Sequence, residues 1–170
     1  QVQTRKGVKD FVEVAKQNPD LYFVWCGGFS FGKITDGYQE LKAIWENPPQ
    51  NVKFLGIIPR EEMNDIYNIC DVLFMPSYNE LFPMSILEAV NLNKPILLRN
   101  LELYEDILFH KYIMGKNNEE FSSNLKKLSK DKEFYNEASN NSKYISNYYS
   151  KEHVSEIWKN FYLDIYNKVQ

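Results

Sequence analysis

Several features are scarce or missing in this chain of 170 residues. Its two cysteines, Cys26 and Cys70, are too few for a disulfide-stapled domain, and both lie in apolar segments. We therefore expect buried free thiols, as in a protein of the reducing cytoplasm. No apolar run approaches the roughly 20 residues that a membrane-spanning helix needs. These absences point to a domain held together by an ordinary hydrophobic core.

An excess of positive charge is also missing. Lys and Arg number 20 against 23 for Asp and Glu, and the net charge is −3. No nucleic-acid partner is therefore expected, because such partners select basic surfaces. The hydrophobic content of 44% and aromatic content of 15% exclude a disordered chain. The length allows one domain with a substantial core.

Short apolar runs alternate with helical patterns over about residues 1–115. The runs are nearly continuous, as in strands that are buried on both faces of a parallel sheet. They occupy residues 21–27, 52–56, 71–77 and 95–99, and helical patterns lie around 8–15, 38–45, 63–69 and 84–90. This order predicts an α/β fold, a Rossmann-like doubly wound parallel sheet flanked by helices. Three further helical patterns over about 117–168 predict a helical C-terminal tail.

The chain starts without Met, in the middle of a pattern, at "QVQTRKG". We therefore expect a fragment whose first strand, or whole first half, precedes Gln1. Residues 1–170 would then be a single Rossmann-like domain.

The first strand-to-helix turn contains a near match to a phosphate-binding P-loop. Gly27, four residues, Gly32 and Lys33 have almost the right spacing. However, the motif needs Ser or Thr after the lysine to bind magnesium, and Ile34 stands there. Asp71 also begins its predicted strand instead of ending it. A P-loop-like ATP-binding domain is therefore a disfavoured alternative, and a GxGxxG fingerprint is absent.

Two glutamates flank the start of the fourth predicted helix, in the stretch "NELFPMSILEA". Glu88 is the one charged residue from Leu81 to Asn93, and Glu80 lies in the loop just before. Either residue could be an ordinary solvated or capping charge. A carboxylate in apolar surroundings nevertheless needs a partner, and vicinal hydroxyls of a sugar can donate two hydrogen bonds to it. Pro83 would open the helix, because proline suits the first helical position.

A basic pair precedes the first predicted helix. Arg5 and Lys6 are followed by Gly7, which permits close approach of the backbone to a ligand. The pair could be a solvated turn or a clamp on a diphosphate, since lysine is a point charge well suited to phosphate.

Together these segments resemble the C-terminal half of family-4 retaining GT-B glycosyltransferases, over almost the whole chain. "RKGVKDFVEVAK" resembles the family's RKG opening, and "NVKFLGIIPREEMNDIYNICDVLFMPS" resembles its run from the base-binding turn to a strand that ends in Pro-Ser. "ELFPMSILE" resembles its E-x7-E signature, which is the most specific of the three. "GGFSFGKITDGY" together with "NELFPMSILEA" is more narrowly similar to glycosyl-diacylglycerol synthases of Gram-positive bacteria.

The resemblance implies a role for each motif in binding a UDP-sugar. Glu88 would bind the ribose hydroxyls and Glu80 the hexose, while Lys6 would neutralise the diphosphate. The backbone near Ile57 and Ile58 would frame the base. Lys6 and Glu80 are the implied catalytic residues, and the implied donor-binding set is Arg5, Lys6, Gly7, Ile57, Ile58, Glu80, Leu81, Phe82, Pro83, Met84 and Glu88. The family's usual Gly-Arg before this turn would fall near Gln1, so Arg5 could make that contact instead.

The implied activity is transfer of a glucose or galactose from the UDP-sugar to an acceptor hydroxyl with retained configuration. Diacylglycerol or a glycosyl-diacylglycerol is the implied acceptor. No Asp-x-Asp occurs, so no metal or other cofactor is expected. The acceptor half would be the missing N-terminal domain, and the present domain alone would be inactive. The whole protein would be cytoplasmic, and with a lipid acceptor it would be peripheral at the inner face of the plasma membrane.

A non-enzymatic α/β interaction domain, such as a receiver-like regulator, is the last alternative. It would need a phosphoacceptor Asp at the end of a central strand, and none is visible. His110 and His153 are isolated in the sequence and are expected to be surface or packing residues.

Overall fold

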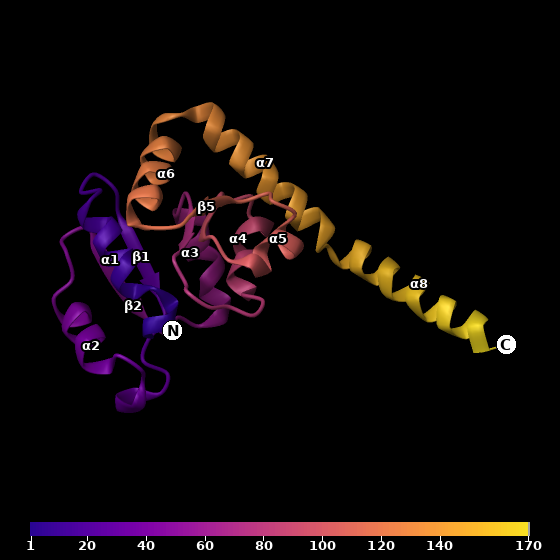
Figure 1. Ribbon diagram of the computed structural model, residues 1–170, viewed down its shortest axis with the longest axis horizontal. Coiled ribbons are helices and arrows are strands. Elements are labelled where there is room, and N and C mark those ends of the chain that lie inside the picture. The colour runs from indigo at the N-terminus through magenta and orange to yellow at the C-terminus, as the bar shows by residue number, and fades with distance from the viewer. Residues whose placement is uncertain (170) are drawn as a thin grey trace.

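Parallel strands alternate with helices in the N-terminal two thirds of the computed structural model, which describes residues 1–169 (Figure 1). Short 3-10 turns occupy Thr4–Lys6, Gly32–Ile34 and Arg60–Glu62. The strands are β1 (Phe23–Cys26), β2 (Val52–Gly56), β3 (Leu73–Met75), β4 (Ile96–Arg99) and β5 (Ile113–Gly115). The helices between them are α1 (Val8–Lys16), α2 (Tyr38–Glu46), α3 (Met63–Ile69), α4 (Met84–Asn91) and α5 (Glu102–Leu108). The expected α/β class is confirmed.

The strands form two parallel sheets and not the single continuous sheet that was expected. β1 pairs with β2, and the second sheet has the order β3-β4-β5. Side chains join the two sheets where backbone hydrogen bonds do not. The ring of Phe11 in α1 lies 5.4 Å from that of Phe23 in β1 and 5.6 Å from that of Phe74 in β3. Aromatic packing under α1 therefore holds both sheets in one fold.

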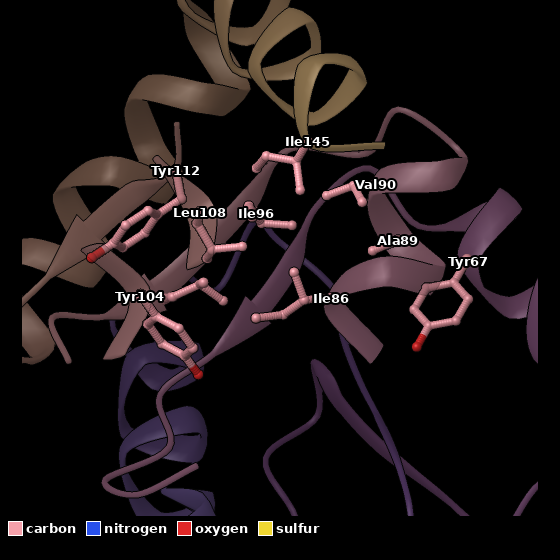
Figure 2. Packing of buried hydrophobic residues seen from close by; sticks show 10 residues of the cluster. Tyr67, Ile86, Ala89, Val90, Ile96, Tyr104, Leu108, Tyr112 and Ile145 are labelled. Carbon is pink, nitrogen blue, oxygen red and sulfur yellow. The ribbon is translucent and has the colours of Figure 1, made fainter. Parts of the chain in front are cut away.

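The largest buried cluster lies between β4 and the helices that cover it. Ile96 and Leu98 of β4 are buried against Ile86 and Val90 of α4, and Ile145 reaches them from the C-terminal helices (Figure 2). Tyr67 of α3 forms the edge of this cluster. Each of these helices buries one apolar face on the sheet, and this burial stabilises the alternating arrangement of strands and helices.

Three helices complete the chain, as the sequence predicts: α6 (Asn118–Lys130), α7 (Lys132–Tyr148) and α8 (Lys151–Val169). The side chains of Asn117 and Asp131 cap α6 and α7 by accepting hydrogen bonds from backbone N–H groups. α6 and α7 pack on the α/β layers, whereas α8 projects away from them (Figure 1). Within the described residues, no helix combines the length and apolarity that crossing a membrane would require.

Three local expectations need correction. The helix α4 begins at Met84, and Pro83 is its extended N-cap residue with a ψ of 115°, so proline does not occupy the first helical position. The sequence patterns also missed α5 and β5, where charged residues interrupt the apolar positions. Cys26 and Cys70 are free, as expected, but both are half-buried because each lies at the end of its element.

Candidate functional site

Lys6 and Glu80 form an ion pair at the carboxyl end of β3. Lys6 Nζ lies 2.7 Å from Oε1 and 2.8 Å from Oε2 of Glu80. The Glu80 side chain is only 5% exposed, against 21% for Lys6. Such burial is costly for a carboxylate, and the two charge-assisted hydrogen bonds offset that cost. Thus the structure brings together the two residues to which the resemblance assigns catalysis.

Backbone contacts hold the turn that carries Lys6 against the loop that carries Glu80. The N–H of Tyr78 donates to the carbonyl of Arg5 over 2.8 Å, and the Arg5 guanidinium donates to the carbonyl of Asn79 over 3.2 Å. Gly7 has a φ of +73°, and a Cβ at this position would lie 2.3 Å from the carbonyl oxygen of Pro76. Only glycine fits there without strain, because both its φ and the approaching backbone exclude a side chain.

Glu88 lies on α4 and has a partner on α3. The hydroxyl of Tyr67 donates a hydrogen bond of 2.9 Å to Oε2 of Glu88. Burial, together with this hydrogen bond to a carboxylate, raises the pKa of Tyr67 above its ordinary value. Figure 2 shows the Tyr67 ring at the edge of the buried cluster. One oxygen of Glu88 is therefore held in place by a neutral phenol, while the carboxylate itself remains half-buried.

The loop between Glu80 and α4 presents apolar side chains to solvent. Leu81 is 86% exposed and Met84 is 55% exposed. Phe82 is partly covered by Tyr149, whose ring centroid lies 5.5 Å away. The first N–H groups of α4, those of Met84 and Ser85, have no acceptor within the helix, and the helix dipole makes this end favourable for an anion.

The predicted base-binding residues follow β2. Ile57 is 73% exposed, and its side chain lies against Gly28 in the loop after β1. Ile58 is half-buried beside it. The shared role of these isoleucines with Glu80 and Glu88 stays a prediction.

The P-loop alternative does not fit the geometry after β1. Lys33 lies in a 3-10 turn, Gly32–Ile34, and extended Thr35 follows it. The helix α2 begins only at Tyr38. A P-loop lysine instead stands at the start of the helix whose N–H groups bind phosphate.

No group of three or more His, Cys, Asp or Glu side chains in the described part of the chain is placed to hold a metal ion. The expected independence from metals stays a prediction. His153 lies against Tyr148, whose backbone carbonyl is 2.6 Å from its Nδ1, and His110 is an exposed residue in a turn.

Two residues near the site were not found from the sequence. Tyr67 was assigned only to the apolar face of its helix, and Arg99 only to the end of a strand. Arg99 forms an ion pair with Asp10 of α1 and donates a hydrogen bond of 2.9 Å from Nε to the carbonyl of Pro76. A basic residue at the carboxyl end of a buried strand was the one available signal, since a charge there needs a partner.

The fold and the position of these charges define a class: a Rossmann-like α/β domain with polar side chains gathered at the carboxyl ends of parallel strands, where such domains bind ligands. Residues 1–144 match the family model "Glycosyl transferases group 1", and the chain belongs to this family.

Curated relatives agree with this assignment. The chain is 44% identical over 162 residues to alpha-galactosylglucosyldiacylglycerol synthase of Streptococcus pneumoniae, an alignment that covers 95% of this chain and 43% of that protein. It is 35% identical over 126 residues to processive diacylglycerol alpha-glucosyltransferase of Acholeplasma laidlawii, with coverage of 73% and 37%. The chain thus spans less than half the length of these relatives.

Solved structures share the fold. The Anabaena protein HepE, crystallised with UDP-glucose, superposes with a TM-score of 0.76 at 18% identity, over 94% of this chain and 47% of that one. The C-terminal domain of the group 1 glycosyl transferase LpcC from Francisella tularensis gives a TM-score of 0.71 at 19% identity, with coverage of 87% and 81%. The chain thus superposes on about half of HepE and on most of the LpcC C-terminal domain, as a Rossmann-like half of a GT-B fold would.

Proposed function

We propose that this chain is the donor-binding domain of a hexosyltransferase that takes a glucose or galactose from a UDP-sugar. The observation that carries the proposal is the buried Lys6–Glu80 pair at the carboxyl end of β3. An ammonium and a carboxylate side by side suit a ligand that carries a diphosphate next to a hexose. A relative that crystallised with UDP-glucose and two that are named for glycolipid synthesis support the same reading.

Each charged group has a place in the proposed reaction. Glu88, oriented by Tyr67, accepts hydrogen bonds from the ribose hydroxyls, and Glu80 accepts them from the hexose. As the bond between the anomeric carbon and the diphosphate oxygen breaks, its electron pair moves to the diphosphate. Lys6 neutralises that charge, together with the N-terminal N–H groups of α4. The oxygen of the acceptor hydroxyl bonds to the anomeric carbon, and the hydroxyl proton passes to the departing diphosphate. The sugar keeps its configuration, and no metal takes part.

The proposed acceptor is diacylglycerol or a glycosyl-diacylglycerol, by analogy with the relatives' names. The acceptor would bind in the other half of a longer polypeptide, working at the cytoplasmic face of the membrane. We propose that α8 contacts that half. Its Trp158 and Phe161 are about half exposed. Its Lys residues are balanced by Glu and Asp residues, so a negatively charged bilayer offers it no electrostatic advantage.

Calorimetric titration tests the proposal. This chain is titrated with UDP, UDP-glucose, UDP-galactose and Mg-ATP, and the titrations are repeated on Glu88→Ala and on the exposed control Glu137→Ala. The proposal expects UDP binding that Glu88→Ala abolishes and the control retains. ATP binding that is indifferent to Glu88→Ala contradicts it. If nothing binds, the same variants are assayed for hexosyl transfer in the full-length enzyme, where an active Glu88→Ala overturns the proposal.

A further inference from the structure

Arg99 stands at the end of β4, and its guanidinium contacts three segments of the chain. Nε donates to the carbonyl of Pro76 over 2.9 Å, and Nη1 donates to the carbonyl of Lys116 over 3.3 Å. Nη2 forms the ion pair with Asp10 of α1. The two side chains are only 11% and 17% exposed. Only the planar guanidinium group of arginine, with its several N–H donors in fixed directions, can bind these three acceptors at once.

The surroundings of Arg99 fix its position as well. Its guanidinium carbon lies 4.0 Å from the centroid of the Tyr78 ring. The amide of Asn118 donates to the other oxygen of Asp10 over 3.3 Å. Asp10 also interacts with the hydroxyl of Tyr78 and raises the pKa of that phenol. Arg99 and Asp10 therefore form the centre of a polar cluster that borders residues 76–78.

The contacts of Arg99 continue through this loop to Lys6. The Pro76 carbonyl that Arg99 binds is the one that faces Gly7. Tyr78, whose ring contacts the Arg99 guanidinium, donates a hydrogen bond from its backbone N–H to the carbonyl of Arg5. The Lys6 turn is thus packed on a loop that Arg99 also contacts, at the carbonyl of Pro76 and the ring of Tyr78.

We propose that Arg99 is a positioning residue for donor binding, which holds residues 76–80 so that Lys6 and Glu80 meet the diphosphate and the hexose in the correct geometry. This inference rests on the proposed function. Arg99 touches neither the donor nor the reacting atoms. Its effect should therefore be confined to the diphosphate and sugar end of the donor and should spare the nucleoside end, which Glu88 and Tyr67 hold from α4 and α3.

Arg99→Lys is the sharpest variant, because it keeps the positive charge beside Asp10 and removes the fork that reaches Pro76. The control is Lys132→Arg, the reverse exchange at an exposed residue that begins α7. Calorimetry compares UMP with UDP-glucose. We expect the UMP affinity of Arg99→Lys to stay within twofold of wild type and the UDP-glucose affinity to fall at least tenfold. Equal losses for both ligands would mean a merely structural role and would overturn the inference, as would no loss.

A second measurement does not depend on the donor. Urea unfolding is measured for Arg99→Lys, Lys6→Met and the double variant. If Arg99 positions the Lys6–Glu80 pair, the two losses of stability are less than additive, because residues that share a network do not act independently. Additive losses overturn the inference. A wild-type chain and full-length enzyme that bind no UDP-sugar would overturn the proposed function itself, whatever the coupling between Arg99 and Lys6.

Discussion

The ammonium of Lys6 lies 2.7 and 2.8 Å from the two carboxylate oxygens of Glu80, although 74 positions separate the residues in the sequence. In the donor-free chain, the charge that would receive a diphosphate is therefore already neutralised. Under the proposed function, a donor would replace this contact with its own phosphate and hydroxyl groups. The pair would then affect both the stability of the empty domain and its selectivity for donors.

Removing one partner of this pair should destabilise the fold. We expect Lys6→Met to lower the free energy of unfolding by about 2–3 kcal/mol, because it leaves the buried Glu80 carboxylate without its cation. Lys9→Met is the matched control. Lys9 pairs with Glu40, but both side chains are well exposed, so its loss should cost at most about 0.5 kcal/mol. Urea unfolding of the two variants measures the difference, and equal values would contradict the prediction.

Neutralising the other partner should have opposite effects on two ligands. Glu80→Gln frees Lys6, so UDP should bind roughly three- to tenfold more tightly, by about 1 kcal/mol. The extra affinity for UDP-glucose over UDP should disappear, because the hexose loses its carboxylate partner. Calorimetry with both ligands checks this, with Glu40→Gln as the exposed control. Weaker UDP binding in Glu80→Gln would show that the carboxylate does not compete for Lys6.

The hydrogen bond from Tyr67 should matter for the nucleoside end of the donor. Tyr67→Phe removes a bond to a charged group, worth about 1.5 kcal/mol, and leaves Glu88 free to rotate. We expect UDP to bind roughly tenfold more weakly, with less discrimination between UDP and 2′-deoxy-UDP. Tyr22→Phe, at a ring that is 88% exposed, should change neither quantity. Unchanged affinity in Tyr67→Phe would separate the phenol from donor binding.

Gly7 should not tolerate a side chain. Gly7→Ala places a Cβ 2.3 Å from the Pro76 carbonyl and forces alanine into the left-handed region. Gly32→Ala is a close control, since Gly32 has a φ of +55° and open space around its Cβ position. The control should lose about 1–2 kcal/mol from backbone strain alone. Thermal unfolding should show a clearly larger loss for Gly7→Ala, together with weaker UDP-glucose binding. Similar losses of stability in both variants would show that the loop moves and removes the clash between the new Cβ and the Pro76 carbonyl.

Alkaline pH should destabilise the domain through its buried phenols. Burial raises the pKa of Tyr67 and of Tyr104 above the ordinary value of 10. Below pH 10 these two phenols make their full contribution to the free energy of unfolding. That contribution is lost as the pH rises above 10, because the tyrosines of the unfolded chain then release protons that the folded chain retains. Each such tyrosine adds up to about 1.4 kcal/mol of destabilisation per pH unit. Urea unfolding from pH 9 to 11 should show a shallower decline in Tyr67→Phe than in wild type, and parallel curves would refute this.

Sequence patterns predicted most of the fold because they report local burial. The range expected for β2, residues 52–56, matches the structure, and the helical pattern expected around 84–90 falls within α4, Met84–Asn91. The elements that were missed, α5 and β5, span seven and three residues. Charged side chains interrupt both segments, at Glu102, Glu105 and Asp106 in α5 and at Lys111 and Lys116 beside β5, so neither forms a clear apolar run. The division into two sheets was also missed, since hydrogen bonding between strands leaves no local signal.

The candidate site was predicted from motifs, and its geometry was not. The sequence by itself determined the α/β class, the family through its E-x7-E and RKG motifs, and the identity of the charged residues at the strand ends. Tertiary structure alone decided which charges meet: Lys6 with Glu80, Tyr67 with Glu88, and Arg99 with Asp10. The reason is physical. The periodicity of a sequence shows which face of a helix or strand is buried. It does not show which side chains meet, because the partners in these three pairs lie 21 to 89 positions apart in the chain. Their pairing depends on how the helices and strands pack and on the need of each buried polar group for a partner.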